Sequence, residues 1–147
     1  MSREIKFRGK VKYSRGFATY KGGFLPQGSW VYGSLQTRTC DKDIRISFLC
    51  EGTCVEEHVI VDPETVGQFT GVFDKNGKEI FEGDILRTAS STPAYPIEQP
   101  VVWLEEYLCW GVDFQKGHCF HLFECNFDSR GEVIGNIHQG GKQCLTL

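Results

Sequence analysis

The feature that most constrains the fold is that the apolar runs are short and are separated by glycine-marked turns. Apolar and charged residues alternate along residues 5–13 and 44–48, which is the period of a β-strand. Helical periodicity is not sustained anywhere in the chain. Further strand-like runs occupy residues 30–35, 54–61, 85–87, 101–104, 108–114, 118–127 and 133–138. We therefore expect an all-β protein of about eight to ten short strands.

Local signals place the turns between these strands. Asn76 and Gly77 lie between apolar runs at residues 68–73 and 79–81, which strongly predicts a β-hairpin. A glycine inside a strand pattern marks a bulge or bend, so we expect the chain to bend at Gly83. Asp62 precedes Pro63, a capping residue before proline, which predicts one short helical turn. Residues 88–100 hold three prolines and predict a long surface loop.

The order of these elements suggests an architecture. The elements expected between Gln68 and His138 are, in order, a hairpin, a bend, a long loop, a second hairpin and a closing strand. By analogy, this order is associated with SH3-like barrels. We expect a small, partly open barrel over residues 62–138, an additional N-terminal β layer over residues 1–61 and a tail over residues 139–147. A chain of 147 residues fits a single compact domain. The expected core residues include Ile80, Phe81, Ile85, Val133, Ile134 and Ile137.

The seven cysteines bear on cellular location. They are irregularly spaced, in a chain whose start alternates charged and apolar residues where an export signal needs an apolar core. Reduced thiols and a cytoplasmic location are the natural expectation. The apolar stretches are far shorter than the roughly 20 residues of a membrane span, so no membrane contact is expected.

Two clusters of cysteine and histidine have the short spacings of candidate metal sites. One comprises Cys50, Cys54 and His58, and the other comprises His118, Cys119, His121 and Cys125. Neither supplies the two tight ligand pairs that are typical of structural zinc, so buried, inert thiols are the favoured interpretation. No activated nucleophile, paired acid and base or phosphate-binding loop is evident. We therefore predict no catalytic residue, metal or cofactor, with a zinc protein or enzyme as the weaker alternative.

A basic strand is the main candidate for partner binding. Residues 1–23 carry a net charge of +6 and the remainder −9. The candidate partner-binding residues alternate along this strand: Lys6, Arg8, Lys10 and Lys12. Positive strands beside aromatic rings hold single-stranded nucleic acid, but alternation directs Phe7 and Tyr13 away from the cations. A solvated or oligomer-facing edge strand is favoured over nucleic-acid binding.

Five stretches that run through most of the chain resemble the YopX-like family of phage and prophage proteins. They are EIKFRGK from residue 4, GSWVYG from residue 28, VDPETVGQFTG from residue 61, DKNGKEIFEGDI from residue 74 and VIGNIH from residue 133. The resemblance implies a mostly β protein encoded in phages or integrated prophages, without an assigned activity or cofactor. The tail at residues 139–143 departs from the family pattern, which has a helix-prone tail containing Asn-Pro.

These observations together favour a non-enzymatic phage or prophage accessory protein that acts by contact with a protein partner and self-associates through edge strands. A single-stranded nucleic-acid-binding module is the alternative. Polar residues near the expected bend have two interpretations: they are contact residues, or they hold the turn through hydrogen bonds to the backbone. These residues are Gln68, Thr70, Glu82 and Asp84.

Overall fold

The computed structural model describes residues 4–16, 24–49, 55–88, 97–115, 118–121 and 131–139. In these ranges the regular structure consists of antiparallel strands and one 3-10 turn, η2 (Pro63–Thr65), which confirms the all-β prediction. The side chain of Asp62 caps η2 by accepting a hydrogen bond from Glu64 N–H at 3.1 Å, as its sequence predicts. No helix in the described ranges has the length and apolar character needed to cross a membrane.

The chain divides into two compact units, Met1–Gln68 (unit 1) and Phe69–Leu147 (unit 2). The boundary falls inside strand β7 (Gly67–Phe73), rather than after Val61 where the sequence suggested a change of subregion. That the whole chain behaves as a single domain stays a prediction.

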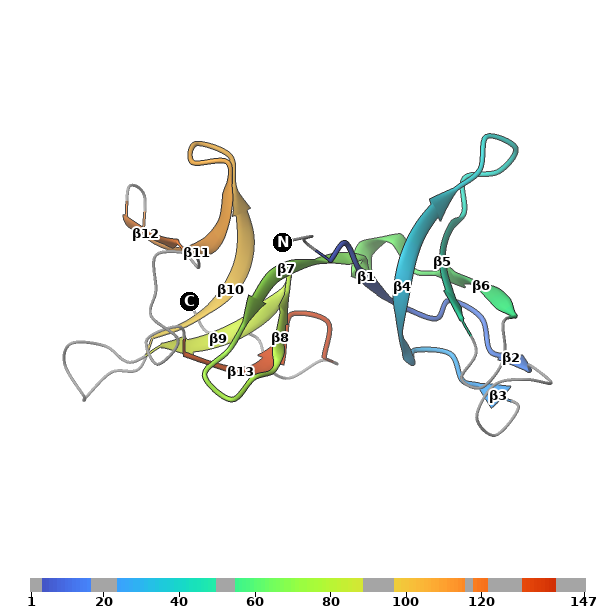
Figure 1. Cartoon of the computed structure of the whole chain (residues 1–147), viewed down its shortest axis with the longest axis horizontal. Helices are drawn as coiled ribbons and strands as arrows, with labels where there is room; N and C mark the ends of the chain where they lie inside the picture. The colour runs from blue at the N-terminus through green and yellow to red at the C-terminus, as the bar shows by residue number, and fades with distance from the viewer. Residues whose placement is uncertain are drawn as a thin grey trace. The chain divides into compact units, whose positions relative to one another are not determined.

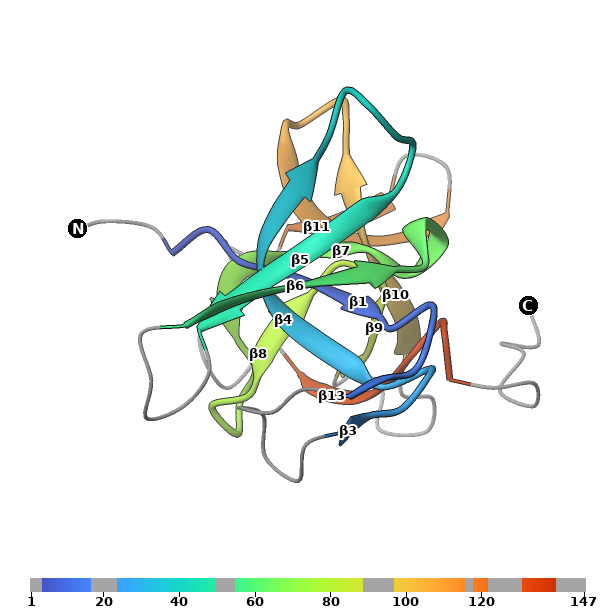
Figure 2. The same ribbon diagram turned by 90° about the vertical axis from the view of Figure 1, so that its right-hand side faces the viewer.

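Unit 1 contains a sheet with the order β6-β5-β4-β1-β7. Figure 1 shows these strands, and Figure 2 presents β6, β5, β4 and β1 toward the viewer. A separate two-stranded pair is formed by β2 (Arg15–Gly16) and β3 (Phe24–Leu25). The four remaining strands of the sheet are β1 (Phe7–Lys10), β4 (Trp30–Thr37), β5 (Ile44–Leu49) and β6 (Glu56–Val61).

The sheet of unit 1 curls so that the end of β6 returns to the chain just after β1. Val11 and Val61 form an isolated antiparallel bridge. Lys12 N–H donates to the Ile60 carbonyl at 3.0 Å, and Asp62 N–H donates to the Lys10 carbonyl at 2.8 Å. The N-terminal strands therefore form a curled, partly open sheet, and not a flat layer.

Side chains on the inner face of this sheet form the core of unit 1. Its fully buried members are Val11, Leu25, Val31, Ile46, Val59 and Val61. Phe7 packs against them, as the alternation of β1 predicts. Ile5 and Tyr13 were expected on the same face, but they lie outside β1 and are 69% and 61% exposed. The regular strand is shorter than the alternating sequence, so the apolar residues at its two ends are not carried into the core.

Unit 2 contains the predicted hairpin of β7 and β8 (Glu79–Phe81) and a five-stranded sheet of order β12-β11-β10-β9-β13. In the described ranges, the pairings of this sheet are open at β12 and β13, so it does not close into a barrel. The five strands are β9 (Asp84–Thr88), β10 (Ile97–Leu104), β11 (Cys109–Gln115), β12 (His118–His121) and β13 (Glu132–Asn136).

The loop predicted over residues 88–100 is wrong at its C-terminal end, because β10 already begins at Ile97. Pro100 pairs with Ile85 of β9, whereas the pairing with β11 starts only at the next residue, Val101. Proline has no N–H to donate, so it fits in this strand where one of the two neighbours is not yet paired. Residues 89–96 lie outside the described ranges.

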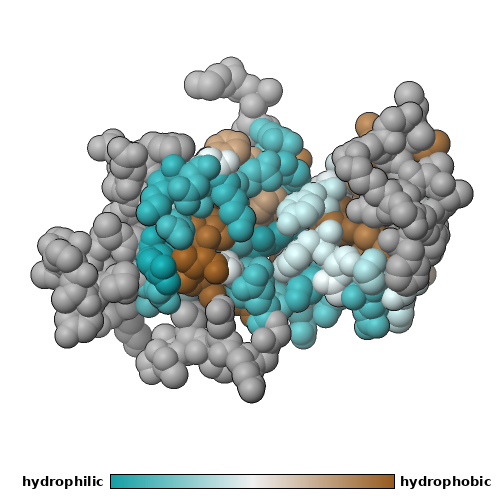
Figure 3. All heavy atoms as spheres, turned by 90° about the horizontal axis from the view of Figure 1, so that it is seen from below, coloured by the Kyte–Doolittle hydropathy of each residue, from teal (hydrophilic) through white to brown (hydrophobic). Residues whose placement is uncertain are grey.

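The core of unit 2 includes Ile80, Leu86, Val101, Trp110 and Val112. Ile80, Phe81 and Ile85 are buried as predicted, and Val133 packs at the edge of this core. Ile137 was expected in the core, but it follows the end of β13 and is 52% exposed. Figure 3 shows that hydrophobic residues also reach the surface between hydrophilic ones.

Asp74 organises the turn between β7 and β8. Its carboxylate is buried and accepts hydrogen bonds from the N–H groups of Asn76 and Lys78, both at 2.8 Å. Gly77 has a φ of 80°, whereas Asn76 does not enter the left-handed region. The turn is therefore a longer one with a single left-handed glycine, not a two-residue turn with two positive φ values.

Candidate partner-binding face

The register of β1 against β4 brings cations and aromatic rings to one face of unit 1. Arg8 lies opposite Tyr32, and Lys10 lies opposite Trp30. Directly paired residues project to the same side of a sheet, so the four side chains form one group. We call this group, together with Lys6 and Lys12 at the two ends of β1, the cation–aromatic face.

Trp30 is the centre of this group. The Cζ atom of Arg8 lies 4.6 Å from the centroid of the Trp30 ring, and the Lys10 Nζ lies 5.4 Å from it. A cation within about 6 Å of an aromatic centroid is attracted by the negative face of the ring. The two cations are therefore held against Trp30 and not extended freely into solvent.

The four cations predicted for partner binding differ in exposure. Arg8 is only 5% exposed, so it is a packed residue and does not present its charge on an open basic strand. It lies between β4 and β7, pairing with Tyr32 on one side and Gly67 on the other. Lys6, Lys10 and Lys12 are partly exposed. Lys6 forms an ion pair with Glu4 at 3.4 Å, and Lys12 Nζ lies 5.5 Å from the Tyr13 ring.

The aromatic members of the face were not identified from the sequence as partners of the basic strand. Alternation within residues 5–13 separates the local aromatics from the cations, and Trp30 and Tyr32 are some 20 residues further along the chain. Their position follows from the register between two strands, which depends on long-range pairing. Tyr32 is 46% exposed, which leaves one ring of the group accessible.

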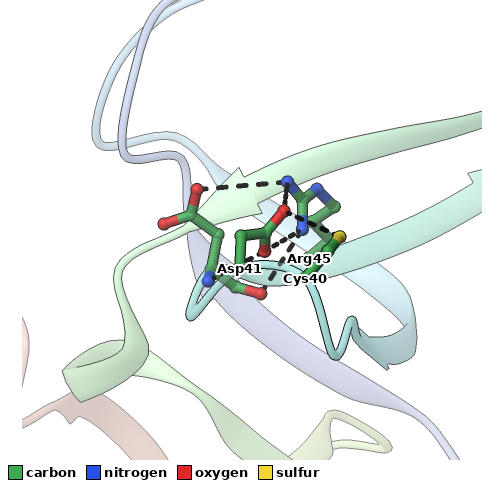
Figure 4. A network of polar contacts seen from close by, with 4 residues as sticks. Cys40, Asp41 and Arg45 are labelled. Carbon is green, nitrogen blue, oxygen red and sulfur yellow. Dashed lines mark hydrogen bonds and ion pairs between the residues drawn. The ribbon is translucent and has the colours of Figure 1, made fainter.

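The same face continues toward β5 through Gln36, which is paired with Arg45. Gln36 Nε2 donates to Ser47 Oγ at 3.3 Å. Arg45 donates to both carboxylate oxygens of Asp41, at 2.9 and 3.0 Å, in the turn between β4 and β5. Figure 4 shows this network, in which Cys40 Sγ also lies 3.8 Å from Asp41 Oδ2.

This ion pair changes the pKa of its two members. The hydrogen bond from Arg45 is the main cause that holds the pKa of Asp41 below its ordinary value. The same contact raises the pKa of Arg45. Asp43 N–H also donates to Asp41 Oδ1 at 3.1 Å. The carboxylate of Asp41 therefore holds both the Arg45 guanidinium and the backbone of the turn. We assign this cluster a structural role at the edge of the face.

Two of the four polar residues near the predicted bend, Thr70 and Asp84, have structural roles. Thr70 is buried, and its hydroxyl donates to the Ile80 carbonyl at 2.8 Å and accepts from Val72 N–H at 3.2 Å. Asp84 is buried and accepts from Phe81 N–H at 2.8 Å. These two residues hold the turn through backbone hydrogen bonds and are not exposed contact residues. Gln68 and Glu82 are partly exposed.

The two cysteine and histidine clusters lie largely outside what the structure describes. Cys50, Cys54 and Cys125 fall outside the described ranges, and β12 is described as backbone only. Among the residues that are described, no group of three His, Cys, Asp or Glu side chains is placed to hold a metal ion. Cys40 and Cys109 form no disulfide.

Fold and face together define an antiparallel β protein with two hydrophobic cores and a surface where cations adjoin aromatic rings. The chain belongs to the YopX family, because the family model described as YopX protein matches residues 24–142. A comparison with curated proteins finds no match. The matched range contains Trp30 and Tyr32, whereas strand β1 with Arg8 and Lys10 precedes it.

Proposed function

We propose that this YopX-family chain is a non-enzymatic phage or prophage accessory protein of the bacterial cytoplasm, and that it acts by binding a protein partner. The observation that carries the proposal is the cation–aromatic face, where Arg8 and Lys10 contact the ring of Trp30. Aromatic residues and arginine are enriched in protein interfaces, where a few of them provide most of the binding energy.

The arrangement supports binding more than catalysis. Arg8 and Trp30 form a packed base, and the half-exposed Tyr32 and the partly exposed Lys10 surround it. A preformed aromatic platform gives up little conformational freedom when a partner covers it. The partly exposed lysine ammonium groups at its rim favour an acidic partner and increase the association rate.

Affinity capture tests this proposal. Tagged protein carrying Tyr32→Ala, Lys10→Gln and Lys12→Gln is compared with the parent protein in cells in which the phage or prophage is active. We expect the triple variant to lose a protein that the parent captures in a stoichiometric amount. The matched control carries Ile137→Ala, Lys42→Gln and Lys75→Gln, all exposed residues outside the face. Equal capture by parent, variant and control contradicts the proposal.

Single-stranded nucleic acid is a second candidate because the structure adds Trp30 and Tyr32 to the side that carries the cations. Such ligands are bound by positive grooves and by rings on which bases stack. Fluorescence anisotropy with a labelled deoxythymidine oligomer tests it. Binding that falls steeply between about 50 and about 200 mM salt, and that Tyr32→Ala abolishes, supports nucleic acid. No binding at the lower salt concentration excludes it.

A further inference from the structure

The turn between β10 and β11 exposes apolar side chains beside two acidic residues. Trp103, Tyr107 and Leu108 are 42%, 49% and 76% exposed. Glu105 and Glu106 are exposed in the same turn. We call residues 103–108 the hairpin tip; it is at the end of the orange hairpin in Figure 1.

Leu108 combines two unfavourable features. Its φ is 51°, which makes it the one non-glycine residue with positive φ in the described ranges. A bulky side chain in this region is strained, and natural turns place glycine or asparagine there. The strain is not repaid by burial, because Leu108 is the most exposed of the large hydrophobic residues in the described ranges. Backbone strain that burial of the side chain does not offset is typical of functional sites.

The tip is supported by the core of unit 2. Trp103 pairs with Trp110, and their rings meet edge to face with centroids 5.1 Å apart. Trp110 belongs to the buried core with Val101 and Val112. Tyr107 N–H donates to the Leu104 carbonyl at 3.1 Å, which closes the turn. The exposed side chains are therefore held on a rigid hairpin and need little ordering when they bind.

We propose that the hairpin tip docks on the cation–aromatic face of a second copy of this chain. The two surfaces are complementary in charge: Glu105 and Glu106 on the tip face the lysines at the rim of the other surface. Their apolar groups also match, since Leu108 and Tyr107 meet the aromatic rings of Trp30 and Tyr32. This inference rests on the proposed function, because it names a partner for the face described there.

The contact joins two different surfaces, so it is head-to-tail. One copy that offers its hairpin tip keeps its own cation–aromatic face available for a third. Association therefore extends with concentration unless the ends close into a ring. Salt screens the charged part of the contact, so association weakens as ionic strength rises.

Sedimentation velocity of the full chain over a range of concentrations tests the proposal. We expect Leu108→Asn to raise the dissociation constant at least tenfold. Asparagine tolerates the left-handed conformation, so the variant keeps the turn and its thermal midpoint stays at or above that of the parent. Ile137→Asn is the matched control, because Ile137 is an exposed apolar residue of unit 2 outside the tip. It should leave association unchanged.

A charge exchange identifies the two surfaces. Glu105→Lys with Glu106→Lys, and separately Lys10→Glu with Lys12→Glu, should each abolish self-association. An equimolar mixture of the two variants should restore association, because the altered tip of one variant is complementary in charge to the altered face of the other, and their intact tip and face remain complementary too. Lys42→Glu with Lys75→Glu is the matched control for the face variant, because both lysines are exposed outside the face, and by itself it should leave self-association unchanged.

Three results overturn the proposal. The first is a parent protein that stays monomeric up to about 1 mM, and the second is self-association that Leu108→Asn does not weaken. The third is a mixture of charge variants that fails to associate. If any of these occurs while the affinity capture still depends on Tyr32 and Lys10, the self-docking inference fails and the proposed function stands. A foreign protein whose capture is lost in Leu108→Asn then identifies the tip as a site for another partner.

Discussion

Asp74 Oδ2 accepts a hydrogen bond from the backbone N–H of Val133 at 3.0 Å, although 59 residues separate the two. The other carboxylate oxygen of Asp74 holds the turn between β7 and β8. One buried side chain therefore ties that hairpin to β13, the last described strand of unit 2. Lys75 N–H donates to the Gly131 carbonyl at 3.0 Å and reinforces the same junction.

Asp74→Ala should lower the free energy of unfolding by about 2–4 kcal/mol, because it leaves backbone N–H groups without the acceptor that they have in a buried site. Urea unfolding followed by tryptophan fluorescence measures the change. Asp62→Ala is the matched control: Asp62 also accepts a backbone N–H, but at an exposed turn, and its loss should cost about 1 kcal/mol. Equal losses in the two variants would show that the tie to Val133 contributes nothing.

Gly33→Ala should prevent unit 1 from folding normally. A Cβ atom at Gly33 would overlap the carbonyl oxygen of Ser47 in the neighbouring strand β5. Backbone cannot move aside as a flexible side chain can, so β4 and β5 would have to separate. We expect a loss of more than about 3 kcal/mol, measured by thermal unfolding. Ser34→Ala, at the exposed next residue, should change stability by less than about 0.5 kcal/mol.

Arg8 should not be replaceable by lysine without loss. Its Cζ atom lies over the Trp30 ring, 4.6 Å from the centroid, and a lysine ammonium would keep the charge but lose the planar, delocalised group that suits an aromatic face. We expect Arg8→Lys to cost about 1 kcal/mol of stability and to change the tryptophan fluorescence. Lys10→Arg is the converse change at the partly exposed cation and should be tolerated. If Arg8→Lys leaves both signals unchanged, the contact between the guanidinium and Trp30 contributes no stability.

The Asp41–Arg45 pair predicts a pH dependence. Because the pKa of Asp41 is lowered in the folded protein, chiefly by the Arg45 hydrogen bond, its contribution to stability is present above the ordinary value of 3.8. The contribution is lost as the pH falls below 3.8 through the folded pKa. Arg45→Gln should raise the Asp41 pKa toward its ordinary value in a carbon-detected NMR titration of the carboxyl group. Lys42→Gln should leave it in place.

Local patterns predicted several elements because their causes are local. The hairpin after Gln68 follows from two apolar runs around a glycine, and the cap at Asp62 follows from its neighbour Pro63. Gly83 indeed has a positive φ, of 85°. The sequence is compatible with either a contact role or a turn-holding role for Thr70 and Asp84, and their burial decides in favour of backbone hydrogen bonds.

The remaining features of the fold and of the face depend on long-range strand pairing, which local sequence patterns do not predict. The cation–aromatic face depends on the register that places Trp30 opposite Lys10, and no pattern within either strand specifies that register. The burial of Arg8 arises from two neighbouring strands that are distant in sequence. The extension of β10 through Pro100 likewise depends on which neighbour is paired at that residue. Each of these results requires contacts that a single strand does not encode.

Strand β7 has a practical consequence for dissecting the protein. Its first two residues, Gly67 and Gln68, pair with β1, whereas Phe69 and Phe73 pair with β8. A fragment ending before Gly67 would expose the free edge of β1, and a fragment starting after Phe73 would remove a strand from the β8 hairpin. Recombinant halves of the chain should therefore each include Gly67–Phe73, so that the segment is duplicated and not cut.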